Sequence, residues 1–268
     1  MLADYHLHSQ FSADSDLDLD TICRTAVNKG IKEIAVTDHY DIDYMDDTIE
    51  FILDKENYLN ELEKYQQKFA GKLKIKKGIE MGLQLHIFEE CDNYLADDFD
   101  FIIGSFHTVE KADLYRGDFF RGYEQWEAYL QYLKTVLNVI KNYNNFNVIG
   151  HLDLVRRYGD FDSSPDLMEN KTAAELVKEI LKILIKKDKG LEVNTSGYHL
   201  EDGKNPMPSW NILELYYELG GKILTLGSDS HYSAQIGYKF EETAEKLKEI
   251  GFKTLTTFTE GKPDFYKI

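Results

Sequence analysis

Short apolar runs typical of β-strands alternate with longer helical patterns along almost the whole chain, and this alternation constrains the fold most. Seven runs are rich in β-branched and aromatic residues, and an eighth lies near the end; they predict strands at residues 3–8, 31–37, 74–81, 99–105, 146–151, 190–195, 222–228 and 252–258. Buried strands that alternate with helices are typical of a parallel sheet. About seven such repeats without a linker favour a closed α/β barrel over an open sheet.

Apolar positions three or four residues apart predict four helices between these strands. They cover residues 18–30, 123–143, 172–190 and 241–251. The helix at 172–190 ends in lysines followed by Gly190, which is the usual composition of a helix C-terminus. The most irregular segments are expected at 105–122 and 195–210. We therefore predict a single barrel domain over residues 1–268.

Composition and charge exclude several classes of protein. The formal net charge of −17 disfavours nucleic acid as a partner, because binding to phosphate backbones requires a basic surface. No apolar run reaches the roughly 18 residues of a membrane span, and the N-terminus does not resemble a signal peptide. Cys23 and Cys91 are isolated, which suits a reducing compartment. We expect a cytoplasmic protein with no nucleic-acid or membrane partner, and its oligomeric state stays open.

Most of the histidines fall at one kind of position. Six of the eight lie at or just beyond the predicted C-terminal end of a strand: His6, His8, His39, His107, His151 and His231. The other two are His86, near a predicted helix start, and His199, in a loop. Because the carboxyl ends of parallel strands meet on one face of a barrel, the six side chains are expected at a common mouth.

The chemistry of these side chains points to transition-metal ions. Imidazole combined with carboxylate suits zinc, iron or manganese. His6 and His8 are two residues apart on a strand, so they face the same side and can bind one ion together. Glu80 ends the third predicted strand, and its two oxygens can bridge two ions. A group of ions would also reverse the local field of this acidic protein, so that a small phosphate ester can bind.

The ordered motifs resemble a known family. They are "HLHSQFSAD", "TDH", "GIEMG", "GSFH", "GHLDLVRRYG", "NTSG" and "GSDSH", and they span roughly residues 4–231. In this order they resemble the polymerase-and-histidinol-phosphatase (PHP) superfamily, and within it the histidinol-phosphatase branch. The resemblance implies a distorted (β/α)7 TIM-like barrel with a multinuclear metal site at the carboxyl ends of its strands.

The resemblance also implies three divalent ions, zinc, iron or manganese, and their ligands. The first ion would be held by His6, His8, Glu80 and Asp229. The second would share Glu80 and add His107 and His151. The third would take His39, His231 and Asp14. Many family members have histidine at the position of Asp14. The aspartate is expected to weaken binding of the third ion or to shift the preference of this site toward harder cations.

The activity implied is metal-assisted hydrolysis of a phosphate monoester, with L-histidinol phosphate cleaved to L-histidinol and phosphate in histidine biosynthesis. In this chemistry the ions activate a water molecule and stabilise the charge on the transferred group. Asp229 and His39 are the candidates for proton handling. The alternative is another PHP-family phosphoesterase that acts on a different small phosphate ester or nucleotide.

Basic residues near the expected mouth are candidates for binding the substrate phosphate, because guanidinium groups bind phosphate oxygens bidentately. Arg157 is the preferred candidate, with Arg156 beside it, and Arg116 and Arg121 lie after the fourth predicted strand. After "NTSG" the family typically has arginine, whereas this chain has Tyr198 and His199. His199, or Lys204 further along, is expected to replace that contact.

Two readings from other classes stay open at this level. A metal-dependent amidohydrolase-like barrel also begins with an HxH pair, but such enzymes often carry a carboxylated lysine, and here strands three and four end in Glu80 and Ser105. A non-enzymatic metal-binding protein would have lost ligands, whereas every expected position holds a plausible donor. Neither a G-x-S-x-G nucleophile motif nor a P-loop occurs in the sequence.

Overall fold

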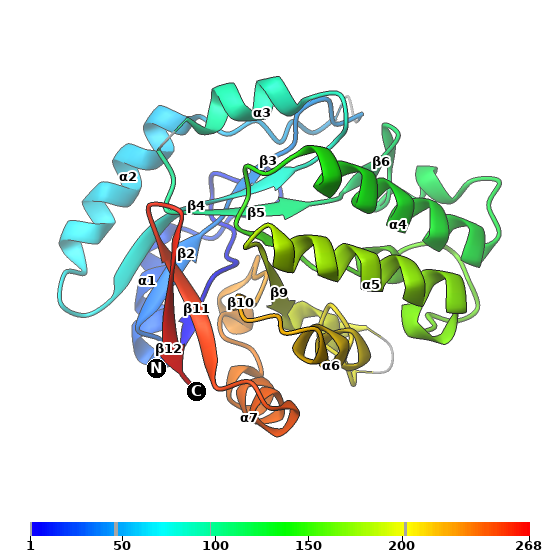
Figure 1. Ribbon diagram of the computed structural model, residues 1–268. Helices are drawn as coiled ribbons and strands as arrows, with labels where there is room; N and C mark the ends of the chain where they lie inside the picture. The colour runs from blue at the N-terminus through cyan, green and yellow to red at the C-terminus, as the bar shows by residue number, and fades with distance from the viewer. Residues whose placement is uncertain (1, 46–47, 97, 201–202) are drawn as a thin grey trace.

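A computed structural model describes residues 2–45, 48–96, 98–200 and 203–268 (Figure 1). Its centre is a sheet of seven parallel strands, which lie side by side in the order in which they occur along the chain. They are β1 (Ala3–Asp4), β2 (Glu33–Val36), β4 (Lys74–Gly82), β5 (Phe101–Ser105), β8 (Val148–Ile149), β9 (Gly190–Asn194) and β10 (Leu224–Gly227). The short strand β3 (His39–Tyr40) also pairs with β4.

The first and last strands of the sheet meet, so the sheet is a nearly closed barrel. The Tyr5 N–H donates to the carbonyl of Leu226 (2.8 Å), and the Asp229 N–H donates to the carbonyl of His6 (2.8 Å). Leu7 and Ser230 form an isolated parallel bridge at the same seam. The predicted α/β barrel is therefore confirmed.

Seven helices surround the barrel in the described part of the chain (Figure 1). They are α1 (Leu19–Asn28), α2 (Lys55–Lys68), α3 (Phe88–Leu95), α4 (Gln125–Asn142), α5 (Lys171–Lys186), α6 (Trp210–Glu218) and α7 (Phe240–Ile250). α5 shows why they form: Asn170 caps its first turn, and Val177, Ile180 and Leu184 make a buried stripe at helical spacing. The four predicted helices are confirmed as α1, α4, α5 and α7.

Two predicted strands are shorter than expected. Within the run 3–8 only Ala3–Asp4 form a strand, and within the run 146–151 only Val148–Ile149 do. In both cases the chain leaves the ladder before the histidines. His151 has a φ of +24°, which is incompatible with continued strand structure.

The last predicted strand lies outside the barrel sheet. β11 (Thr254–Thr259) pairs antiparallel with β12 (Lys262–Lys267), and this hairpin crosses one end of the barrel (Figure 1). Phe258 packs against Tyr5 and Phe101 there, with ring centroids 6.4 and 5.0 Å away. The hairpin therefore closes the end of the barrel opposite the carboxyl ends of the strands.

The connections after the strands build the other end of the barrel. The segment 105–122, predicted to be irregular, contains the small hairpin of β6 (Thr108–Val109) and β7 (Ala112–Asp113). Five short 3-10 helices occur in the described residues: Asp118–Phe120, Leu154–Arg156, Leu167–Glu169, Thr195–His199 and Ser233–Gln235. None of the helices described has the length and apolar character needed to cross a membrane.

Candidate metal centre and active site

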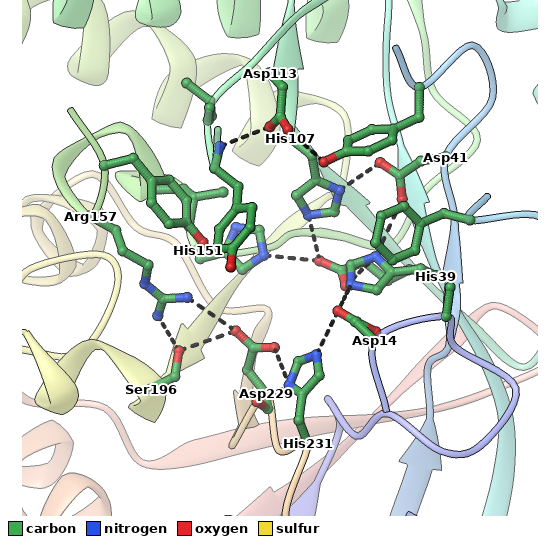
Figure 2. A pocket seen from close by; sticks show the side chains of 18 of the residues that line it. Asp14, His39, Asp41, His107, Asp113, His151, Arg157, Ser196, Asp229 and His231 are labelled. Atoms are coloured by element: carbon green, nitrogen blue, oxygen red, sulfur yellow. Dashed lines mark hydrogen bonds and ion pairs between the residues drawn. The ribbon is translucent and has the colours of Figure 1, made fainter. Parts of the chain in front are cut away.

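A cavity of about 840 Å³ opens at the carboxyl ends of the strands (Figure 2). Seven of the nine predicted metal ligands line it: Asp14, His39, Glu80, His107, His151, Asp229 and His231. His6 and His8 are fully buried next to this group. The barrel thus brings together all nine side chains, from positions 6 to 231 of the sequence.

Glu80, on β4, lies at the centre of the cluster and is 1% exposed. Its Oε2 is 3.0 Å from His6 Nε2 and 3.4 Å from His8 Nε2. Its Oε1 is 2.9 Å from His151 Nε2 and 3.2 Å from His107 Nε2. Oε2 also lies 3.2 Å from His39 Nδ1. The two oxygens therefore face different groups of imidazoles, as a carboxylate that bridges two ions must.

Asp229 follows β10 and completes the first of these groups. Its Oδ1 lies 3.3 Å from His8 Nε2 and 3.7 Å from His6 Nε2. Its Oδ2 faces the other way and accepts from Asn194 Nδ2 (3.2 Å) and Ser196 Oγ (3.1 Å). One oxygen is thus directed at the imidazoles, while the other is fixed at the cavity wall.

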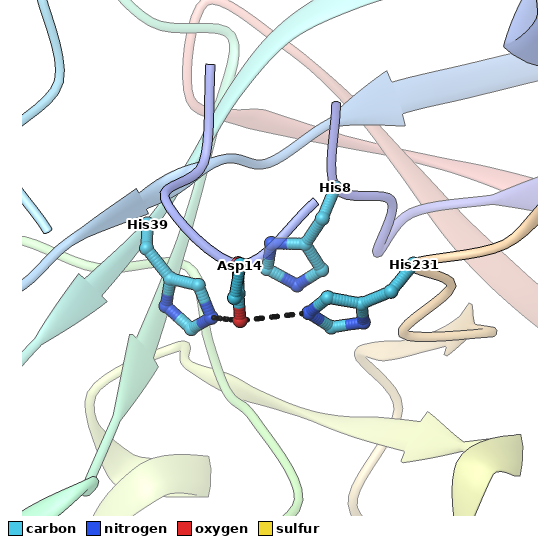
Figure 3. Close-up of side chains that lie close together, drawn as sticks. All are labelled: His8, Asp14, His39 and His231. Atoms are coloured by element: carbon cyan, nitrogen blue, oxygen red, sulfur yellow. Dashed lines mark hydrogen bonds and ion pairs between the residues drawn. The ribbon is translucent and has the colours of Figure 1, made fainter. Parts of the chain in front are cut away.

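A third group lies at the rim and contains Asp14, His39, His231 and His8 (Figure 3). Each offers one ligand atom, and these atoms all lie within 4.8 Å of one another. Asp14 Oδ2 is 2.9 Å from His231 Nε2 and 3.5 Å from His39 Nε2. His8 therefore stands between the first and third groups, although the sequence motifs assigned it only to the first.

The donor set fits divalent ions. His6 Nε2, His8 Nε2, His39 Nδ1 and Glu80 Oε2 are buried and lack hydrogen-bond partners within the described residues, whereas buried polar atoms are normally paired. These atoms are directed at other ligand atoms at separations of 3.0–3.4 Å. Donors about 2.1 Å from a shared ion lie roughly 3.0–3.4 Å apart, so the unpaired atoms match the geometry of metal ligands.

The electrostatics of the cluster favour cations. Burial raises the pKa of the Glu80 carboxyl, but the surrounding imidazoles, led by His6, outweigh burial and hold that pKa well below its usual range. The pKa of Asp229 is depressed for the same reason, again with His6 as the main cause after burial. Burial together with neighbouring imidazoles lowers the pKa of His8 to about 3, so this ring is a neutral donor. Ionised carboxylates beside a neutral imidazole are a suitable environment for divalent cations.

Two buried carboxylates that the sequence motifs did not single out lie behind the ligands. Asp41 Oδ1 is 2.6 Å from His107 Nδ1, and Glu192 Oε1 is 2.6 Å from His6 Nδ1. Burial raises the pKa of Asp41, but His107 outweighs that effect and brings it to about 2. The signal for Glu192 was present in the sequence, since it is a charged residue in the middle of an apolar strand.

The cavity also receives Arg157 and His199. The Arg157 guanidinium donates to Ser196 Oγ and lies 3.7 Å from Asp229 Oδ2 (Figure 2). His199 lines the cavity and stacks on Tyr238 with a centroid separation of 4.8 Å. Both side chains can therefore reach a ligand in the cavity.

The other predicted substrate contacts are not brought to the cavity. Arg156 Nη1 pairs with Asp153 at 2.8 Å, and its other nitrogens donate to backbone carbonyls. It lies in a 3-10 turn, where consecutive side chains diverge, so Arg157 enters the cavity and Arg156 does not. Arg116 and Arg121 lie outside the cavity lining, and each pairs with Asp118, at 3.9 and 2.7 Å.

Aromatic and acidic side chains form a further part of the cavity wall. The aromatic ones are Tyr44, Phe51, Tyr115 and Tyr158. Asp113, which is 3% exposed, accepts from Tyr44 Oη (2.6 Å) and from the Tyr115 N–H (2.8 Å). Motif reasoning did not find this wall, because its residues lie in loops without periodic patterns.

Comparison with known proteins agrees with this geometry. A family model described as PHP domain matches residues 4–196. Histidinol-phosphatase of Lactococcus lactis is 36% identical over 264 residues, which is 97% of this chain and 96% of the relative. Probable histidinol-phosphatase of Thermotoga maritima is 32% identical, with 97% of each chain covered.

Solved structures show the same fold. Histidinol phosphate phosphatase from Lactococcus lactis, complexed with zinc, L-histidinol and phosphate, superposes with a TM-score of 0.90 at 34% identity and covers 98% of both chains. A putative histidinol phosphatase from Listeria monocytogenes superposes with a TM-score of 0.78 at 20% identity, over 90% of this chain and 99% of the other. The second likeness concerns the fold alone.

Proposed function

The chain belongs to the PHP domain family, and on that premise we propose that it is a metal-dependent phosphomonoesterase, a histidinol-phosphatase. The reaction is hydrolysis of L-histidinol phosphate to L-histidinol and phosphate. One observation carries the proposal: the two oxygens of Glu80 face separate groups of histidines beside a cavity that Arg157 also lines. The 36% identity with a histidinol-phosphatase over nearly the whole chain supports the choice of substrate.

The nine side chains that converge at the cavity would hold the metal ions. When bound, divalent ions such as zinc, iron or manganese supply an activated water and positive charge for the phosphate oxygens. Glu80 would contribute to two ion positions, because its Oε2 lies near His6, His8 and His39, whereas its Oε1 lies near His107 and His151. Asp14, with His39 and His231, serves a third position at the rim.

Asp229 is the proposed proton acceptor. Its Oδ2 lies at the cavity wall, fixed by Asn194 and Ser196, and a carboxylate with an ordinary pKa is already ionised at neutral pH. An ionised carboxylate accepts a proton and does not donate one. His39 suits a ligand role better than proton transfer, because carboxylates lie close to both of its ring nitrogens.

Arg157 is the proposed phosphate contact. Its guanidinium lies on the cavity wall, and Ser196 beside it offers a hydroxyl. A planar guanidinium binds two phosphate oxygens at once, which orients the phosphate toward the ligand cluster. His199 is placed to assist, in keeping with its position after the "NTSG" motif.

The wall built by Tyr44, Phe51, Tyr115 and Asp113 supports a leaving group with histidinol chemistry. Histidinol carries an imidazole ring and an ammonium group. Aromatic faces suit a flat or cationic ring, and a buried carboxylate suits a cation.

We also propose that residues 1–268 act as one domain in the cytoplasm, without nucleic acid or membrane as a partner. The hydrogen bonds between the first and last strands of the barrel support a single folding unit. Cys23 and Cys91 are unpaired, and burial raises the pKa of each thiol to about 12, which suits a reducing compartment. The net charge of −17 is unfavourable for polyanions.

The test is an assay of the purified, metal-analysed protein against histidinol phosphate and a panel of phosphate monoesters and diesters. We expect the highest kcat/KM with histidinol phosphate, lower values for monoesters without a cationic ring, and little cleavage of diesters. Efficient turnover of diesters without turnover of histidinol phosphate would overturn the proposal. A preference for another monoester would indicate the alternative function within the same family.

A further inference from the structure

We propose that Glu192 is a positioning residue for the metal centre, one buried carboxylate that fixes ligands of two ions from behind. It lies in the middle of β9 and is 1% exposed. The inference rests on the metal ligands proposed above, and it adds a residue that is not one of those ligands.

The first contact fixes His6. Glu192 Oε1 lies 2.6 Å from His6 Nδ1, while His6 Nε2 is directed at Glu80 Oε2, 3.0 Å away. A carboxylate at Nδ1 keeps the proton on that nitrogen and leaves the lone pair of Nε2 for an ion. Glu192 therefore selects the tautomer and the ring orientation that metal binding requires.

The second contact fixes His151, which belongs to the other ion position. Glu192 Oε2 accepts from the His151 backbone N–H at 2.9 Å. His151 has a φ of +24°, a strained conformation for a residue with a side chain. Such a conformation persists only where surrounding contacts hold it, and here it directs His151 Nε2 at Glu80 Oε1 (2.9 Å).

The third contact reaches Asp229 through an amide. Asn194 Nδ2 lies 3.1 Å from Glu192 Oε2 and 3.2 Å from Asp229 Oδ2. Asp229 is also in a left-handed conformation, with a φ of +53°. One carboxylate is thus connected to three ligands, and two of the three have a strained backbone.

The neighbouring strand makes room for this carboxylate. A Cβ at Gly227, on β10, would lie 2.0 Å from Glu192 Oε1 and 2.5 Å from His6 Cβ. Any larger residue at this position would separate the Glu192–His6 pair. A buried charge is costly unless donors compensate it, and every donor that Glu192 uses belongs to a metal ligand or to Asn194.

The chain supplies a matched control at the other end of the barrel. Glu33 is also a buried glutamate, 2% exposed, and it accepts a 2.6 Å hydrogen bond from Tyr5 Oη. Glu33→Gln makes the same chemical change at a similar depth, on a side chain that pairs with Tyr5 and Lys74 and not with a proposed ligand. It separates the loss of a buried carboxylate from the loss of ligand positioning.

The experiment compares zinc binding by the wild type, Glu192→Gln and Glu33→Gln, by chelator competition on folded protein and by metal analysis. Glutamine has only one acceptor oxygen, so it cannot accept hydrogen bonds both from His6 and from the His151 N–H. We therefore expect the zinc affinity of Glu192→Gln to fall about 10- to 100-fold. The kcat should fall with little change in KM, and excess zinc should restore part of it. Glu33→Gln should bind zinc as the wild type does.

Wild-type zinc affinity and stoichiometry in folded Glu192→Gln would overturn the inference. If that variant does not fold, Glu192→Asp replaces it, because the shorter side chain keeps the charge but withdraws it from His6. Wild-type zinc binding by Glu192→Asp would likewise overturn the inference. Zinc binding does not depend on the substrate. A protein that fails to cleave histidinol phosphate but loses zinc in Glu192→Gln would refute the proposed function and support this inference.

Discussion

Glu80 lies between two groups of imidazoles, and its replacement tests the bridging role. We expect Glu80→Ala to lose most of the bound metal and to lower kcat about 1,000-fold or more, because both ion positions lose a ligand at once. Metal analysis of the purified variant and the phosphatase assay measure the two effects.

Glu80→Gln is the isosteric companion. It keeps one oxygen and the side-chain volume, so it should retain more metal than the alanine variant. Its kcat should still be lower than that of the wild type. Full metal content together with wild-type activity in Glu80→Ala would contradict the bridging role.

Asp4 predicts a pH dependence of stability whose sign is unusual for an aspartate. It is fully buried, and burial raises its pKa to about 6, even though Ser228 and Gly237 donate hydrogen bonds to it. Since the folded pKa lies above the ordinary value of 3.8, the contribution to stability is present below pH 4 and is lost as pH rises through 6.

Asp4→Asn should therefore destabilise the fold more at pH 4 than at pH 7, by on the order of 2 kcal/mol. Urea unfolding of both proteins at the two pH values, with chelator present throughout, measures the difference. If Asp4→Asn destabilises the fold more at pH 7 than at pH 4, the folded protein stabilises the ionised form of Asp4, and the expected pKa shift is wrong.

The end of β4 illustrates how one strand positions a loop residue. A Cβ at Gly82 would lie 2.0 Å from Asp41 Oδ1, the oxygen that faces His107 Nδ1. Gly82→Ala should displace Asp41, release His107 from its orientation and lower kcat at least about 10-fold, with a stability loss of roughly 1–3 kcal/mol.

Gly71→Ala provides the comparison for that strand variant. Gly71 also has a special backbone, with a φ of +77°, but no atom lies within 4 Å of the added Cβ. The Gly71→Ala variant should lose about 1 kcal/mol of unfolding free energy and keep its activity. Equal activity of the two alanine variants would show that Asp41 does not orient His107.

Among the elements, those with a strong periodic signal could be predicted. α5 has a continuous buried stripe, whereas α2 buries only Tyr58 and Leu62 among polar residues, and α3 spans only 8 residues. α6 is apolar on several sides, so its period is unclear. These three helices depend on tertiary packing more than on local pattern.

The same distinction applies to the site. The ligand positions could be predicted because strand ends converge, whatever the details of the loops. Asp41 could not, because a single acid in a loop carries no periodicity and its partner lies far away in sequence. Glu192 stands out as a charged residue in an apolar strand, but the sequence does not indicate that its partner is His6. Arg156 was predicted to face the cavity from its neighbourhood alone, but the turn at Leu154–Arg156 directs it to Asp153.

For the whole molecule, the ions should act as a cross-link between distant segments. Their proposed ligands follow six of the seven barrel strands and include both sides of the seam. At a free ion concentration 1,000 times the dissociation constant, binding raises the free energy of unfolding by about 4 kcal/mol. In a chain of this size that corresponds to a Tm increase on the order of 10 °C.

Removal of metal with a chelator should therefore lower the Tm by about that amount, and added zinc or manganese should restore it. Differential scanning calorimetry measures both steps. A Tm that does not respond to chelation, in protein whose metal loss has been verified, would exclude this cross-linking role.

The seam between the first and last strands of the barrel has a consequence for how the protein is made. His6 and His8 are synthesised first, but Asp229 and His231 come more than two hundred residues later. Until β10 leaves the ribosome, β1 lacks its second neighbour, and the first and third ion positions lack ligands. Complete metal loading therefore has to wait until β10 and the residues that follow it have been synthesised, and a nascent chain arrested before β10 cannot mature into an active centre.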